Sequence, residues 1–213
     1  CLFLQGASGE LGPVEGFVGD TTVAERNGRQ LAHAALSALE ALPAAGTRFE
    51  YAGPVVSGAT LGEWKHTDLP ADITEANADW QLHRQKINLP IRPGTPTTEQ
   101  VTAELAEWET QDIPDARAMA ERKRRMLHRL SQLPPGDEFQ LETIVLKIGG
   151  AVWVIIQGEP YSILQTSLRE RFPDTPLVIA SIASHWGASY LSPRELYGQG
   201  IYQETISVTA PGS

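Results

Sequence analysis

Hydrophobic positions recur at two different spacings along this 213-residue chain, and the spacing separates the expected helices from the expected strands. Between residues 22 and 42, apolar side chains recur three or four positions apart, as they do on one face of a helix. The polar cluster at 20–22 precedes this segment and is typical of a helix start, whereas Pro43 and Gly46 end it. The first long helix is therefore expected at 22–42.

Two further helices are predicted in the middle of the chain. The cluster at 97–99 caps a helix that is expected to end near residue 110. Pro114 starts a second helix, which is expected to end near residue 132. The segment 61–96 shows neither period and is expected to be the least regular part of the chain, because its prolines favour extended backbone.

Strands are predicted where apolar residues alternate with polar ones or run continuously. These segments are residues 1–5, 48–60, 139–148, 152–156, 176–184 and 201–209. Gly149-Gly150 is typical of a hairpin turn, residues 161–172 have the spacing of an amphipathic helix, and 193–198 predict a short turn or helix. Because strands and helices alternate, the sequence predicts an α/β fold with a mixed β-sheet flanked by helices.

Composition and charge narrow the range of partners. The chain is 41% hydrophobic and 20% charged, which fits one soluble globular domain over residues 1–213. A net charge of −9 argues against nucleic acid and anionic lipid as main partners, because phosphate groups are met by clustered Lys and Arg. No apolar run approaches the ~20 residues that a transmembrane helix needs. The sequence does not predict an oligomeric state.

The chain begins with Cys1 rather than methionine and shows no signal peptide. Either the chain is a processed product, or it is an internal piece of a longer protein, truncated at both ends. An alternative interpretation is an N-terminal-nucleophile hydrolase, in which Cys1 is freed by autoproteolysis and its own α-amine acts as the base.

Glu159 is the first candidate for chemistry. It follows the apolar strand at 152–156 and precedes the helix at 161–172. In open α/β sheets, ligands bind at the carboxyl ends of strands, so a carboxylate here is placed where binding groups gather. The alternative is a carboxylate that complements the dipole at the start of the helix.

The second candidate region is the segment 184–203, which follows the other buried strand. It contains His185 and Trp186, and a stretch of thirteen residues within it contains three of the chain's five tyrosines: Tyr190, Tyr197 and Tyr202. A phenol needs a hydrogen-bond partner when buried, and a phenolate can bind a metal. Aromatic packing around a loop is the alternative. The sequence contains no HExxH and no other complete zinc motif.

Five segments, taken in order, resemble the N-terminal catalytic domain of the neutral/alkaline (non-lysosomal) ceramidase family, in its bacterial ceramidase-like branch. The segments are FLQGASGELGP (3–13), ERNGRQLAHAAL (25–36), NLPIR (88–92), VIIQGEPYSILQTSLRERF (154–172) and GASYLSPRELYGQGIYQ (187–203). The last two are the most specific, since Glu159 and Tyr190 are separated by nearly the same number of residues as in the family. The chain would then be the C-terminal portion of that catalytic domain.

The resemblance implies a zinc amidohydrolase of lipid and sphingolipid metabolism that cleaves an N-acyl amide bond, with a lipid or another small-molecule amide as substrate. It implies that Glu159 and Tyr190 are zinc ligands and that Tyr202 hydrogen-bonds the reacting carbonyl region. Two further histidine ligands are expected upstream of residue 1, so none of the five histidines here takes that role. It also implies a secreted, periplasmic or cell-surface location.

Gly12 occupies the position of the family's serine nucleophile, and Glu10 the position of its aspartate. Glycine has no nucleophilic side chain. Two interpretations follow: hydrolysis by metal-bound water, or a relative that keeps the fold but is non-catalytic or has an altered substrate. His185 stands where the family usually has asparagine.

Overall fold

The computed structural model of the chain describes residues 2–57, 59–183 and 189–212. Its contacts divide the chain into two compact units. The sheet unit comprises Cys1–Leu11, Gln81–Lys147 and Ala151–Ser213, and the hairpin unit comprises Gly12–Trp80 and Ile148–Gly150. The expectation of one domain over residues 1–213 stays a prediction.

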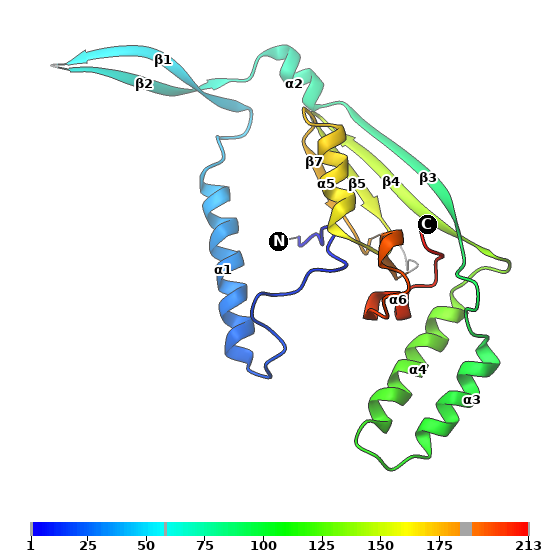
Figure 1. The fold of residues 1–213 in the computed structure, drawn as a ribbon. Helices are drawn as coiled ribbons and strands as arrows, with labels where there is room; N and C mark the ends of the chain where they lie inside the picture. The colour runs from blue at the N-terminus through cyan, green and yellow to red at the C-terminus, as the bar shows by residue number, and fades with distance from the viewer. Residues whose placement is uncertain (1, 58, 184–188, 213) are drawn as a thin grey trace. The chain divides into compact units, whose positions relative to one another are not determined.

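The sheet unit is built around a four-stranded mixed sheet in the order β3-β4-β5-β7 (Figure 1). Its strands are β3 (Trp80–Pro90), β4 (Glu138–Ile148), β5 (Ala151–Ile156) and β7 (Leu177–Ala180). The two-residue strands β6 (Glu159–Pro160) and β8 (Tyr190–Leu191) form a separate parallel pair. The predicted α/β class with a mixed sheet flanked by helices is confirmed.

The helices of this unit lie between the strands in the chain or follow them. They are α3 (Thr98–Glu109), α4 (Ala116–Ser131), α5 (Ser162–Arg171), the short 3₁₀ helix η1 (Arg194–Leu196) and α6 (Tyr202–Ile206). Thr97 begins α3 with the expected cap, because its hydroxyl accepts from Gln100 N while the Gln100 side chain accepts from Thr97 N. Helices α3 and α4 pack against each other as a helical hairpin (Figure 1).

The core of the sheet unit lies between the sheet and the C-terminal segment. Leu89, Phe139, Leu141, Ile156 and Val208 form one buried cluster. β5 and β7 run parallel, with Val152 to Ile155 opposite Leu177 to Ala180. The last residue of β5, Ile156, belongs to this buried cluster, so β6, which begins three residues later, follows directly from the core.

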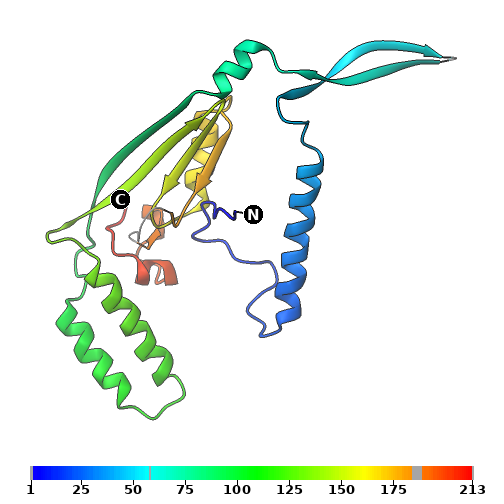
Figure 2. The same cartoon turned by 180° about the vertical axis from the view of Figure 1, so that it is seen from behind.

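The hairpin unit contains α1 (Thr21–Glu40), the antiparallel strands β1 (Thr47–Ser57) and β2 (Ala59–Asp68), and α2 (Ala71–Asn77). Asp20 begins α1 by accepting a hydrogen bond from Thr22 N at 2.9 Å. β1 and β2 pair with each other alone and form a two-stranded sheet (Figures 1 and 2). Among the described residues, no helix is long and apolar enough to cross a membrane.

Three predictions of secondary structure are wrong. Residues 2–5 of the predicted first strand form no strand. They are joined to the residue after β7 by a single backbone hydrogen bond, from Ser181 N to Gln5 O, rather than by the series of bonds that a strand pair needs. The segment 61–96 is far more regular than expected, since it contains β2, α2 and β3. The predicted last strand at 201–209 is instead helix α6, followed by one isolated bridge between Ile91 and Thr209.

Candidate functional site

Three residues that the sequence singled out lie together at the end of the β6–β8 pair. Glu159 and Tyr190 are direct partners in the parallel register of these strands. The Tyr190 ring meets the Tyr202 ring edge-on, with the centroids 6.0 Å apart. We call Glu159, Tyr190 and Tyr202 the site trio. It combines one carboxylate with two phenols, all in the sheet unit.

The Tyr190 hydroxyl is held in its protonated form by its surroundings. Burial, the negative charge of Glu159 and the neighbouring Tyr202 raise the pKa of Tyr190 to about 12, and its hydrogen bond to the Glu159 side chain acts in the same direction. At neutral pH the phenol therefore donates to the carboxylate. A cation bound between the two oxygens would replace this proton.

A backbone hydrogen bond holds residue 159, which carries the carboxylate of the trio, next to β8. The N–H of Glu159 donates to Ser189 O at 2.7 Å, which joins β6 to the residue before β8. Gly158 makes this possible by adopting a positive φ of 76°. A Cβ at Gly158 would lie 2.8 Å from that same Ser189 oxygen, so the two strands approach closely because residue 158 has no side chain.

The opening turn of the chain packs against this strand pair. Gly9 N donates to Pro160 O at 3.0 Å, and Gln203 Nε2 donates to Gly9 O at 3.2 Å. A Cβ at Gly9 would lie 2.6 Å from the carbonyl oxygen of Glu159. The glycine therefore lets the turn lie directly on the backbone that carries Glu159.

Glu10 connects the same turn to helix α5. Its carboxylate accepts from Ser162 N at 2.9 and 3.0 Å and also from the Ser162 hydroxyl, and so caps a helix whose own N-cap side chain makes no such bond. Burial raises the pKa of Glu10, but the hydrogen bonds from Ser162 outweigh it, and the net pKa lies below the ordinary value. Glu10 is therefore a cross-chain helix cap.

Replacing Glu10 by alanine is expected to lower the free energy of unfolding by about 1 kcal/mol near neutral pH, because the cap of α5 is lost. A carboxylate with a depressed pKa stabilises the fold above its ordinary pKa, and that contribution disappears as the pH falls through the lower, folded-state value. The difference between wild type and Glu10→Ala in urea unfolding should therefore shrink in acid. Glu10→Gln keeps an acceptor and serves as the control; a constant difference down to low pH would contradict the cap.

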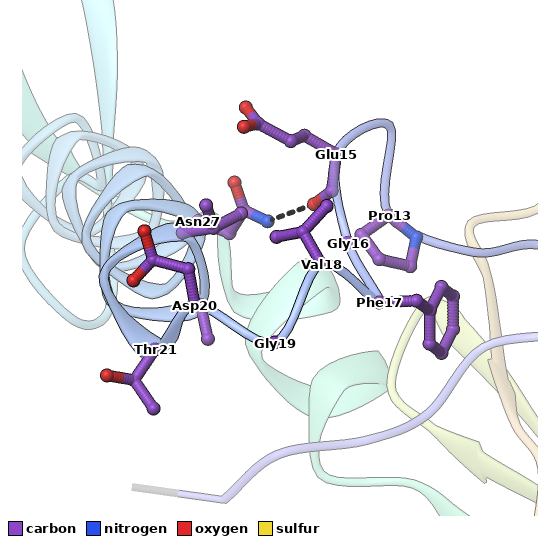
Figure 3. Close-up of a pocket in the computed structure, with 11 residues that line it drawn as sticks. Pro13, Glu15, Gly16, Phe17, Val18, Gly19, Asp20, Thr21 and Asn27 are labelled. Atoms are coloured by element: carbon purple, nitrogen blue, oxygen red, sulfur yellow. Dashed lines mark hydrogen bonds between the residues drawn. The ribbon is translucent and has the colours of Figure 1, made fainter.

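Gly12 belongs to the hairpin unit and offers no reactive group. Its backbone is not in the left-handed region, and a Cβ there would meet only the Phe17 ring edge, at 3.9 Å. A serine would thus fit without strain at this position. The segment directly after Gly12 in the chain lines a pocket of about 380 Å³ at the start of α1. At this pocket, Asn27 Nδ2 donates to Glu15 O at 3.0 Å (Figure 3). Its lining combines apolar side chains with the carboxylates of Glu15 and Asp20.

Two residues near the trio escaped the sequence analysis. Tyr161 is buried, lies two positions after Glu159 and is close enough to raise the pKa of Tyr190. Arg129 near the end of α4 lies within electrostatic range of Tyr202; burial lowers its pKa, and its Nε has no hydrogen-bond partner among the described residues. Tyr161 could have been found from its place two residues after Glu159. No local pattern in the sequence indicates that Arg129 lies near Tyr202.

Two members of the trio, Glu159 and Tyr190, are the residues that the resemblance assigns to a zinc ion. A carboxylate and a phenol side by side are oxygen donors that fit such an ion. Within the described ranges, no group of three or more His, Cys, Asp or Glu side chains could hold a metal. Cys1 and His185 lie outside the described residues. The roles of Glu159 and Tyr190 as ligands and of Tyr202 as a donor stay predictions.

Comparisons of the chain with protein-family models, with curated proteins and with solved structures found no match.

Proposed function

We propose that the protein is a zinc-dependent amidohydrolase of the neutral ceramidase type, which hydrolyses an N-acyl amide bond in a sphingolipid or related amide. The observation that supports this best is the site trio, in which Glu159 and Tyr190 are paired across β6 and β8 while the Tyr202 ring touches Tyr190. The two residues that the resemblance assigns to the metal are thus neighbours, although 30 residues separate them in the chain.

In this proposal Glu159 and Tyr190 would hold the metal, together with two histidines from the expected upstream segment. A bound zinc ion would polarise the amide carbonyl and activate the attacking oxygen. Tyr202, whose side chain is 58% exposed, can reach a substrate and donate its phenolic proton to the carbonyl oxygen as negative charge develops there. Gly12 contributes no nucleophile, so the attacking oxygen is assigned to water.

The test is zinc content together with amide hydrolysis, measured on the full-length gene product that carries these residues. About one zinc per chain and hydrolysis of a short-chain ceramide or an N-acylethanolamine are expected. Tyr202→Phe should keep the zinc and lower kcat by roughly 10- to 1000-fold, because one donor to the developing oxyanion is lost. Tyr197→Phe, the same change at a sheet-unit tyrosine whose hydroxyl contacts Ser207 rather than the trio, is the control.

Two results would contradict the proposal. A full-length protein without zinc would remove the metal site, and full activity of Tyr202→Phe would remove the assigned donor. Zinc binding without hydrolysis of any amide would favour the relative that keeps the fold but has lost the reaction.

A further inference from the structure

The β1–β2 hairpin exposes an unusual amount of apolar surface. Its outer end, residues 51–62, contains no charged residue in a chain that is 20% charged. Val56 is 78% exposed, Leu61 61% and Val55 43%. Among the described residues, no further strand pairs with this hairpin, and a two-stranded hairpin alone is only marginally stable in water, so its apolar surface calls for a second contact.

The apolar side chains at the outer end lie on both faces of the hairpin. Val55 and Val56 are consecutive in β1, so their side chains point to opposite faces. Leu61 pairs with Val55 and shares its face. A folded protein that packs on one face of the hairpin would leave the apolar side chains of the other face in water. An apolar medium that surrounds the outer end of the hairpin covers both faces.

Aromatic rings form the next layer along the hairpin. Tyr51 pairs with Trp64 and Phe49 with His66, and their rings lie 5.6 and 4.9 Å apart; Phe49 also stacks on Trp64 at 5.8 Å. Tyr51, Trp64 and Phe49 are each 55% exposed. Tyrosine and tryptophan prefer the boundary between water and lipid, because each has an apolar body and a polar tip.

Charged residues begin at the level of the aromatic rings, where Glu63 lies opposite Gly53, and four of them form ion pairs. Arg48 pairs with Glu50, and Lys65 pairs with Glu63 at 3.2 Å. Within each pair the charges cancel, and Asp68 at the base leaves the two strands with one net negative charge. From the outer end, the order is therefore an apolar tip and then aromatic rings interleaved with paired charges, which fits the step from the acyl region of a bilayer leaflet to its headgroup level.

We infer that the β1–β2 hairpin inserts its outer end into the surface of a lipid bilayer. From Val56 to Tyr51 the strand runs about 17 Å at about 3.3 Å per residue. A tilted hairpin can thus place its apolar end about 5–10 Å deep while the rings stay at the headgroup level. Because the outer end is uncharged and the whole chain carries −9, the surface it fits is zwitterionic lipid rather than anionic lipid. This inference does not depend on the proposed amidase activity.

Flotation of the full-length protein with phosphatidylcholine vesicles tests the inference. We expect binding that is unchanged at high salt and not strengthened by added phosphatidylglycerol, because insertion is apolar. Val56→Glu combined with Leu61→Glu should lower the vesicle-bound fraction at least about tenfold, since two charges would enter the lipid. The matched control is Ile113→Glu with Ile163→Glu, which adds the same charge at side chains that are 50% and 55% exposed in the sheet unit.

A second measurement does not require these variants to fold. Tryptophan emission should shift to shorter wavelength when vesicles are added, and Trp64→Phe should remove most of that shift while flotation persists. Failure of the wild type to float would overturn the inference, as would equal loss of flotation in both double variants. Loss of a dimer in Val56→Glu/Leu61→Glu, with no vesicle binding by wild type, would assign the surface to a second copy of the chain instead.

Discussion

Glu159→Ala is expected to lower kcat/KM for an N-acyl amide by roughly a thousandfold in the full-length protein, and to lower its zinc content. The carboxylate is the charged member of the site trio, and the polarisation that a zinc ion supplies amounts to several kcal/mol. The alanine variant also leaves the partly buried Tyr190 hydroxyl without its acceptor on Glu159. Both effects act on the candidate site, because the backbone bond from Glu159 N to Ser189 O does not depend on the side chain.

Two further variants isolate the role of that charge. Glu159→Gln keeps an acceptor for Tyr190 but removes the negative charge, so zinc content and activity should fall as they do in the alanine variant. Glu170→Ala removes an exposed carboxylate from α5 and should leave both unchanged. Normal zinc and normal activity in Glu159→Ala would contradict the site assignment, whatever the variant's thermal stability.

Helices with a clear start were predictable from the sequence, and segments without a buried face were not. The cap residues before α1 and α3 marked their first residues to within one position. β2 and most of β3 were not predicted. Their side chains are largely exposed on both faces, so neither strand has the buried face whose alternating apolar residues would have marked it.

The C-terminal segment shows how tertiary contacts override a local pattern. The alternation at 201–209 predicted a strand, but strand-like partners exist only beyond residue 206. Arg92 N donates to Val208 O at 2.8 Å, and Ala210 N donates to Pro90 O at 2.8 Å. Residues 202–206 form no such backbone bonds with a strand in the described part of the chain and form α6 instead, which brings the Tyr202 ring against Tyr190.

The candidate site was predictable only in part. Glu159 was marked by its place after a buried strand, and the resemblance added Tyr190 and Tyr202. The contact of Gly9 with the backbone of Glu159 could not be derived, because it depends on a loop that docks on a strand 150 residues away along the chain. Packing of this kind leaves no periodic signal in the sequence.

Gly158→Ala is expected to destabilise the sheet unit by about 3 kcal/mol, measured as the free energy of unfolding. Two costs combine at this position. The φ of 76° disfavours any residue with a Cβ, and the new methyl group would lie 2.8 Å from Ser189 O. That oxygen accepts from Glu159 N, so relief of the clash requires the β6 and β8 strands to separate.

Gly198→Ala separates the two costs. Gly198 also has a positive φ, of 83°, but a Cβ there would meet nothing within 4 Å, so only the backbone cost of about 1 kcal/mol applies. The difference between the two variants in denaturant unfolding therefore measures how tightly β6 is held against β8. Equal losses would mean that the strands separate readily, and the pairing of Glu159 with Tyr190 would then be too loose to hold a metal between them.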